Sequence, residues 1–268
     1  MKISLITICY NSCKTIARTI ESVLAQNDIQ LEYLIIDGAS KDNTVSIVES
    51  YRSQFEEKGF SYIVKSEPDN GIYDAMNKGV KLANGDIIGI LNSDDYYAES
   101  DILSTVESSF EKYKTDILYG NLLYVKNNKP FRYWKSGKLK SFKSGWMPPH
   151  PAFFVKKDVY EKYGLFRLDC GTAADYELML RFLEKNKASS IWIDKLFTYM
   201  DAGGASSANL TAYKKAHAND KKAWICNELH RPFFSIWLKK IRKLKQFIIP
   251  KKIKDELTKF ETSMILDT

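Results

Sequence analysis

The chain has 268 residues, of which 44% are hydrophobic and 27% charged, and its formal net charge is +7. This composition is typical of a globular protein with one α/β domain and an appendage. No apolar stretch reaches the ~18 residues of a membrane span, and the N-terminus lacks a signal-peptide pattern. We therefore expect a cytoplasmic protein, peripheral at the inner face of the cell membrane.

Strands and helices are expected to alternate through the first hundred residues. Apolar, β-branched runs predict strands at 3–8, 34–36, 60–64 and 87–91. Helices are expected between them, beginning near residues 14 and 44 and covering 72–83. Such alternation predicts a mostly parallel sheet flanked by helices, with the carboxyl ends of its strands at one edge.

The periodicity is weaker after residue 100. We expect a helix at 103–113, a strand at 117–119, a hairpin within 122–134, a strand at 152–155, helices at 158–163 and 175–183, and strands at 191–193 and 197–200. Residues 135–151 form a long irregular segment, which inside a compact domain is often an active-site element. Its lysines, at 135–143, are interpreted either as an acceptor-diphosphate site or as a solvated basic loop.

The C-terminal region is helical in pattern and basic. Ten Lys or Arg lie between Arg231 and Lys259, against only Asp255 and Glu256. Residues 232–249 alternate apolar and cationic clusters, as an amphipathic helix on an anionic membrane does. The alternative is a helix that packs its Trp and Phe face on the domain or on a second subunit.

Acidic residues follow three of the predicted strands. Asp37 comes after the second, Asp69 after the third, and Asp94 with Asp95 after the fourth. Ligands of open α/β sheets bind at this edge, and paired carboxylates suit a hard cation such as Mg²⁺ or Mn²⁺ with a phosphate-bearing substrate. Four cysteines without a CxxC pair, and three scattered histidines, indicate free thiols rather than a zinc site.

Motifs in residues 1 to about 200 resemble those of the family 2 glycosyltransferases, above all of bacterial enzymes that make O-antigen or capsule. The motifs are Thr7-Ile8-Cys9-Tyr10-Asn11, Ile36-Asp37-Gly38-Ala39-Ser40-Lys41-Asp42-Asn43-Thr44, Glu67-Pro68-Asp69-Asn70-Gly71-Ile72-Tyr73-Asp74-Ala75-Met76-Asn77-Lys78-Gly79, Gly85-Asp86, Leu91-Asn92-Ser93-Asp94-Asp95, Pro149-His150-Pro151-Ala152-Phe153-Phe154 and Ala174-Asp175-Tyr176-Glu177-Leu178. The resemblance implies a GT-A fold, which is a Rossmann-like α/β fold, and sugar transfer from a nucleoside diphosphate sugar, with UDP expected as the nucleotide.

The resemblance also implies roles for single residues. Asp175 matches the catalytic base of an inverting transferase, and Asp94 and Asp95 match the metal site for Mn²⁺ or Mg²⁺. Residues expected to contact the nucleotide sugar are Tyr10, Asn11, Asp37, Asp69, Asn92, Asp94 and His150. Asn92 stands where many members carry the first acid of an Asp-x-Asp motif, which leaves the strictness of metal dependence open.

Several of these residues have a structural interpretation as well. Asp37 would be held by neighbouring backbone amides, Asp69 would belong to an Asp-Asn-Gly turn, and His150 would be a packing residue. An acid at position 175 is favourable at a helix N-terminus for electrostatic reasons alone.

We expect a transferase domain at residues 1–205, with a nucleotide-binding half at 1–100 and an acceptor half at 101–205. A helical basic extension would follow at 206–268. The expected partners are a nucleoside diphosphate sugar, a saccharide or lipid-linked acceptor, the membrane surface and a possible second subunit, but no nucleic acid. Two alternatives are a sugar-phosphate nucleotidylyltransferase, although residues 9–13 lack its Gly-rich loop, and a non-enzymatic protein that binds membrane or nucleic acid through the basic tail.

Overall fold

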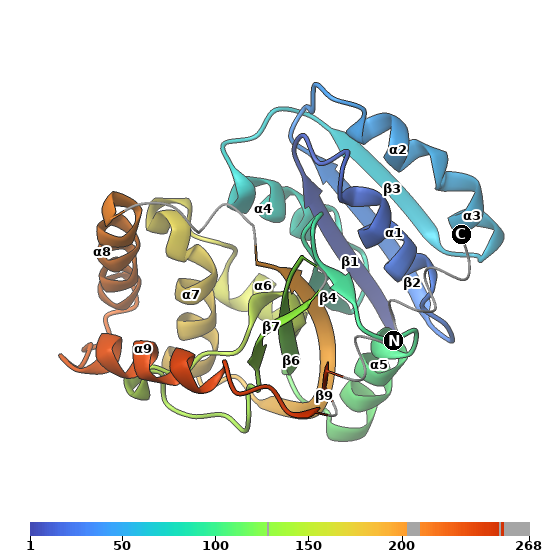
Figure 1. The fold of residues 1–268 in the computed structure, drawn as a ribbon. Coiled ribbons are helices and arrows are strands. Elements are labelled where there is room, and N and C mark those ends of the chain that lie inside the picture. Colours follow the sequence, from blue (N-terminus) through green and yellow to red (C-terminus); the bar gives the residue numbers. More distant parts are fainter. Residues whose placement is uncertain (128, 203–209, 252, 255–268) are drawn as a thin grey trace.

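A computed structural model describes residues 1–127, 129–202, 210–251, 253 and 254 (Figure 1). Its strands are β1 (Lys2–Cys9), β2 (Gln30–Asp37), β3 (Ser61–Ser66), β4 (Ile87–Ile90), β5 (Tyr96–Tyr97), β6 (Ile117–Lys126), β7 (Lys129–Trp134), β8 (Phe153–Lys156) and β9 (Ser190–Asp201). Its helices are α1 (Ile16–Leu24), α2 (Thr44–Ser50), α3 (Arg52–Glu57), α4 (Ile72–Leu82), α5 (Ile102–Tyr113), α6 (Lys157–Tyr163), α7 (Ala174–Met179), α8 (Leu210–Cys226) and α9 (Ser235–Lys245). Shorter helical segments are η1 (Phe142–Ser144), η2 (His150–Ala152), η3 (Leu168–Ala173) and η4 (Leu180–Lys185), which continues α7.

The strands form one sheet in the order β3-β2-β1-β4-β8-β6-β9-β5, and β7 pairs with β6. The first four strands are parallel, as predicted. β8 runs antiparallel to β4 and β6, and β6 is parallel to β9 over most of its length. The predicted α/β fold with a mostly parallel sheet is therefore confirmed.

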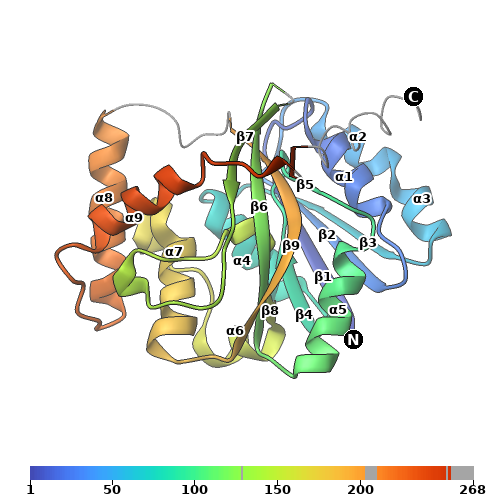
Figure 2. The same ribbon diagram turned by 60° about the horizontal axis from the view of Figure 1, so that its bottom comes forward.

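Both faces of the parallel strands are covered by helices, which explains why these strands are mainly apolar. Side chains alternate along β1, so that Leu5 packs with the face covered by α1 and α5, while Ile6 and Ile8 pack with the face covered by α4. In Figure 2 the helices α1, α2 and α3 lie together at one side of the molecule, while α7, α8 and α9 lie at the other.

Residues 190–201 form one long strand, so the prediction of two separate strands at 191–193 and 197–200 was wrong. The polar pair Asp194 and Lys195 lies inside β9. Asp194 accepts hydrogen bonds from Asn121 Nδ2 at 2.9 Å and Lys135 Nζ at 2.7 Å. Register shifts against β6 near Asn121 let the strand continue through this polar stretch.

The C-terminal region is helical in its described residues, as predicted. α8 packs on α7 and η3 through Trp224, which is fully buried and donates through Nε1 to the Tyr176 hydroxyl at 3.0 Å. α9 packs beside η1, and Arg242 Nε donates to the Ser144 carbonyl at 2.9 Å. None of the described helices is both long and apolar enough to cross a bilayer. The boundary predicted at 205/206 lies outside the described residues and stays a prediction.

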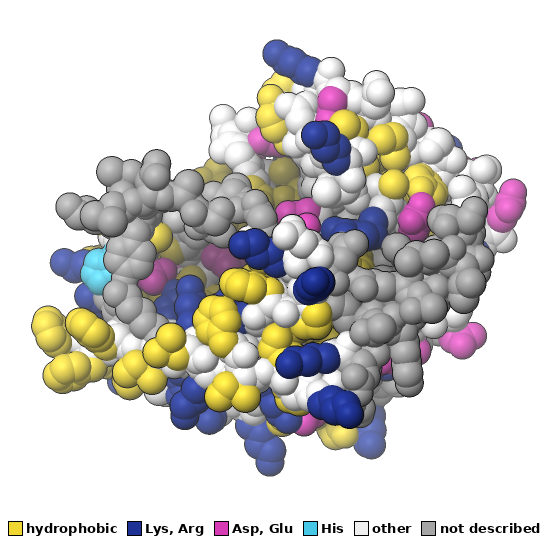
Figure 3. All heavy atoms as spheres, viewed as in Figure 1, with side chains coloured by type: hydrophobic (Ala, Val, Ile, Leu, Met, Phe, Trp, Pro, Cys, Tyr) yellow, Lys and Arg dark blue, Asp and Glu magenta, His cyan; other side chains and the backbone are white. Residues whose placement is uncertain are grey.

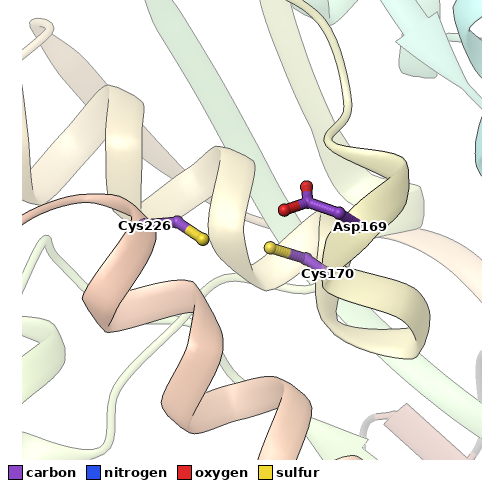
Figure 4. Close-up of side chains that lie close together, drawn as sticks. All are labelled: Asp169, Cys170 and Cys226. Carbon is purple, nitrogen blue, oxygen red and sulfur yellow. The ribbon is translucent and has the colours of Figure 1, made fainter.

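Asp169, Cys170 and Cys226 bring their ligand atoms within 4.8 Å of one another (Figure 4). The Asp169 carboxylate is already paired with Arg167 at 3.0 Å and Lys222 at 3.1 Å. Burial, with the neighbouring Cys226, raises the pKa of Cys170 to about 12, so this thiol keeps its proton. Because metal binding requires thiolates and free carboxylate oxygens, we interpret the cluster as the contact that holds α8 on η3.

Candidate active site

The predicted acids of the first half share one edge of the sheet. Cys9 at the end of β1 pairs with Asp37 at the end of β2, and Asp37 pairs with Ser66 at the end of β3. Asp69 and the segment 92–95 follow directly after β3 and β4. The parallel order of these strands therefore brings the predicted binding residues to the same rim, as expected from their positions in the sequence.

Asp37 is the last residue of β2, and its side chain is fully buried. Its carboxylate accepts hydrogen bonds from the Ser40 amide at 2.9 Å and the Ser66 hydroxyl at 2.6 Å, and the Ser40 hydroxyl also donates to it. These contacts agree with the structural interpretation of Asp37. A direct contact between Asp37 and a nucleotide base stays a prediction.

Tyr10 and Asp69 both lie close to Gly38, the residue that follows Asp37. Tyr10 is 59% exposed, which leaves its ring free to stack on a planar ligand. A methyl group on Gly38 would lie 2.5 Å from Asp69 Oδ2 and 3.4 Å from the Tyr10 ring, so the three residues are in close contact. Asp69 also accepts from the Gly71 amide at 2.7 Å, which is the turn contact that the sequence indicated.

Asn11 supports the neighbouring loop. Its backbone amide donates to the Ser40 hydroxyl at 2.8 Å, and its side-chain oxygen accepts from the Lys41 amide at 2.9 Å. Asn11 has a left-handed backbone with φ of +50°, a conformation that asparagine adopts more readily than most residues. Asn11 therefore shapes the rim beside Tyr10.

The segment 92–95, which follows β4, contains buried polar side chains. Asp95 is fully buried, and Asn92 Nδ2 donates to Asp95 Oδ2 at 2.9 Å. Burial and the adjacent Asp94 charge raise the pKa of Asp95. Burial also raises the pKa of Asp94; nearby Asp201 adds to this effect, and Arg18 opposes it.

This arrangement fits a divalent cation. Asn92 Oδ1 and Asp95 Oδ1 are buried, and within the described part of the chain neither has a hydrogen-bond partner. An unsatisfied buried polar atom costs about 1–3 kcal/mol, and a bound cation would recover that free energy. Carboxylate and amide oxygens are the ligands that Mg²⁺ prefers. Asp95 and Asn92 are therefore candidate ligands, and a metal contact of the neighbouring Asp94 stays a prediction.

A second group of residues encloses a cavity of about 150 Å³ beside this segment. It brings together three of the predicted residues, Asn92, His150 and Asp175, from distant parts of the sequence. The other side chains that line it are Ile72, Tyr73, Met76, Leu122, Tyr124, Trp134, Met147, Pro149, Pro151 and Met200. Asp175 lies in the first turn of α7, and its Oδ1 accepts a hydrogen bond from the Tyr73 hydroxyl at 3.1 Å.

Sequence reasoning missed three residues of this site. Tyr73 orients Asp175, and burial together with the Asp175 charge raises the pKa of its hydroxyl, so Tyr73 stays a donor. Tyr124 lines the cavity near both Asp95 and Asp175, whose charges add to burial in raising its pKa. Arg18 donates to the Asp94 carbonyl at 3.3 Å. Tyr73 stands within the motif that begins at Glu67, although no role was predicted for it, whereas the positions of Tyr124 and Arg18 carried no local signal.

His150 gives the site a pH-dependent stability. Burial lowers the pKa of His150 in the folded state, and the Asp175 charge opposes this only in part. The unfolded chain therefore binds more protons as pH falls through about 6.5, and folding stability decreases. We expect a His150→Gln variant to lose part of this decrease between pH 7 and pH 5.5 in urea unfolding. If the free energy of unfolding of the variant falls with pH as steeply as that of wild type, the prediction is wrong.

Comparison with known sequences shows which family the chain belongs to. A family model described as glycosyl transferase family 2 matches residues 4–174. An uncharacterized glycosyltransferase of Mycobacterium tuberculosis H37Rv is 35% identical over 189 residues, which cover 67% of this chain and 68% of that protein. A PGL/p-HBAD biosynthesis glycosyltransferase of Mycobacterium bovis BCG is 27% identical over 179 residues, which cover 66% and 68%.

Solved structures share the fold at lower identity. TarS 1–349 of S. aureus in complex with UDP-GlcNAc superposes with a TM-score of 0.67 at 20% identity, covering 89% of this chain and 70% of that one. A longer TarS chain is covered only to 44% of its length. The mannosyltransferase PcManGT of Pyrobaculum calidifontis, in complex with GDP-Man and Mn²⁺, gives a TM-score of 0.60 at 14% identity and coverages of 98% and 80%. The fold is GT-A, and the chain belongs to glycosyl transferase family 2, as its motifs predicted, and is a transferase.

Proposed function

We propose that this enzyme transfers a sugar from a nucleoside diphosphate sugar, in the first place a UDP-sugar, to a hydroxyl of a lipid-linked saccharide. The product would be a bacterial surface polysaccharide of the O-antigen or capsule type. The observation that carries the proposal is the cavity shared by Asn92, His150 and Asp175, which joins the predicted donor edge of the sheet to the predicted base.

The donor would lie along the rim of the parallel strands. Its base would stack on the exposed Tyr10 ring and lie against Gly38 and Asp69, above the buried Asp37. Its diphosphate would reach the segment 92–95. A divalent cation bound there would neutralise the negative charge of the diphosphate as it leaves.

Asp175 would act as the general base. The Tyr73 hydroxyl holds one of its oxygens at 3.1 Å, which orients the carboxylate in the cavity where the acceptor hydroxyl would bind. Asp175 would remove the proton from that hydroxyl while the oxygen attacks the anomeric carbon. A single displacement of this kind inverts the configuration at the anomeric carbon. The apolar walls, with Tyr124 and Trp134, would exclude water from this step.

The C-terminal region supports an acceptor at a membrane surface. Apolar residues at a spacing of three and four lie on one side of α9 and its flanks, and they are exposed: Phe234, Trp237, Ile241, Leu244 and Ile248. Each of these side chains is at least 50% exposed. Figure 3 shows apolar and cationic side chains next to each other at the lower left of the molecule, where Figure 1 places α9. Such a surface suits the peripheral membrane attachment that we propose.

Nucleotide binding tests the donor part of this proposal. We expect UDP with Mn²⁺ to raise the melting temperature more than GDP or CDP does, because the donor is proposed to be a UDP-sugar. Gly38→Ala should weaken UDP binding by about tenfold or more, since its methyl group would displace Asp69 from the proposed base site. Asp175→Asn should bind UDP normally. The proposal fails if none of the three nucleotides stabilises the protein.

A further inference from the structure

A second cavity, of about 270 Å³, lies between α9 and the segment that follows β7. Five cationic side chains line it: Lys135, Lys239, Arg242, Lys243 and Lys245. None of the described side chains around it is a carboxylate. We call this cavity the basic pocket.

Only part of this positive charge is balanced by acids. Lys135 pairs with Asp194 at 2.7 Å, and Lys239 pairs with Asp220 at 3.0 Å. Arg242 donates to the Ser144 carbonyl and hydroxyl, which carry no charge. Within the described residues, Lys243 and Lys245 form no ion pair. Three positive charges therefore face the pocket without a charged partner.

The closeness of these positive charges affects the pKa of Lys243. Desolvation of its ammonium group lowers the pKa of Lys243, and the neighbouring Lys239 and Arg132 lower it further, against the weaker effect of Asp220. Like charges held together in this way destabilise the protein until an anion binds between them. The positive charge that lines the pocket therefore suits an anionic ligand.

The position of α9 over this pocket depends on a glycine. Gly145 has a φ of +71°, and a methyl group on it would lie 2.3 Å from the backbone nitrogen of Lys239. The α9 backbone therefore lies directly on the loop after β7, which brings Lys239, Arg242 and Lys243 to the pocket wall. The pocket is a product of the fold, because its cations come from residues about a hundred positions apart.

The basic pocket adjoins the candidate active site. Trp134 and Met147 line both this pocket and the cavity that contains Asp175. We propose that the basic pocket binds a phosphate or diphosphate group of the acceptor, so that the saccharide attached to it extends past Trp134 toward Asp175. This inference rests on the proposed transfer reaction and names the chemical class of its acceptor: a glycan carried on a phosphate ester or diphosphate.

Binding of inorganic pyrophosphate, measured by calorimetry in EDTA, tests the pocket without involving the metal site. We expect the wild-type protein and Asp94→Asn to bind pyrophosphate equally well. A Lys243→Gln/Lys245→Gln variant should bind it at least tenfold more weakly. The matched control is Lys81→Gln/Lys112→Gln, which removes the same charge from exposed lysines outside the pocket and should stay within twofold of wild type.

The outcomes separate this inference from the proposed function. Loss of pyrophosphate binding in both double variants, or in neither, overturns the pocket. If the wild-type protein does not bind UDP in the presence of Mn²⁺, the donor assignment is wrong, whatever the result with pyrophosphate.

Binding to vesicles of phosphatidylglycerol shows whether the pocket takes the phosphate of a glycan or that of a lipid headgroup. The wild-type protein could fail to bind pyrophosphate while the Lys243→Gln/Lys245→Gln variant loses its binding to vesicles. In that case the cations contact lipid headgroups, and the acceptor proposal is wrong. The melting temperature of the Lys243→Gln/Lys245→Gln variant should not be lower than that of wild type, because the substitutions remove repulsion between the lysines of the pocket.

Discussion

Replacing Asp175 by asparagine is expected to slow sugar transfer by about 10²–10⁴-fold, the range that a positioned general base contributes. Asparagine keeps the size of the side chain and can still accept the hydrogen bond from Tyr73, but it cannot take the acceptor proton. The turnover number at saturating donor and acceptor, measured by mass spectrometry of the product, checks this result. The dissociation constant for UDP should stay within twofold of wild type.

Tyr73→Phe is the matched control for orientation. It removes only the hydroxyl that donates to Asp175 at 3.1 Å and leaves the aromatic ring, which stacks on Phe166. Hydrogen bonds to charged groups contribute about 1.5–3 kcal/mol, so we expect the turnover number to fall by about ten- to a hundredfold. Wild-type turnover in Asp175→Asn would show that another group removes the proton. A loss in Tyr73→Phe as large as in Asp175→Asn would show that the tyrosine has a role beyond orientation.

The first half of the fold was predictable because its signals are local. Each strand from β1 to β4 is apolar on both faces, and an acidic or amide side chain follows at its carboxyl end. In β9, by contrast, Asp194 and Lys195 interrupt the apolar pattern. Their polar groups are satisfied by Asn121, Lys135 and Asp101, which come from other segments. The sequence alone does not show that those partners are within reach.

The same reason limited the prediction of the active site. Asp94, His150 and Asp175 stand in motifs that indicate their chemistry, and the structure places His150 and Asp175 in one cavity. The walls of that cavity come from β6, β7 and the loop before β8, through Tyr124, Trp134 and Met147. These residues look like ordinary core or strand residues in the sequence. Only the pairing of β6 with β7 and β9 brings them beside Asp175.

Removing the Asp94 carboxylate is expected to give the second large effect. In Asp94→Asn the candidate cation site loses one negative charge, while buried Asp95 keeps the hydrogen bond from Asn92. A bound metal contributes several kcal/mol to charge stabilisation, so transfer with Mn²⁺ should fall by about 10²–10³-fold. EDTA should slow the wild-type enzyme by a similar factor. A wild-type enzyme that keeps its full rate in EDTA would show that its own side chains neutralise the diphosphate without a cation.

Asn92→Asp tests whether the asparagine sets the strength of metal binding. The substitution removes the Asn92 amide, which donates to Asp95 at 2.9 Å. It also places a third carboxylate beside Asp94 and the fully buried Asp95. Without metal, repulsion and the lost hydrogen bond should lower the free energy of unfolding by about 1–3 kcal/mol. Mn²⁺ should stabilise this variant more than wild type, because the added carboxylate is a ligand that the cation prefers. If Mn²⁺ stabilises both proteins equally, position 92 lies outside the metal's coordination sphere, and only Asp94 and Asp95 remain as candidate ligands.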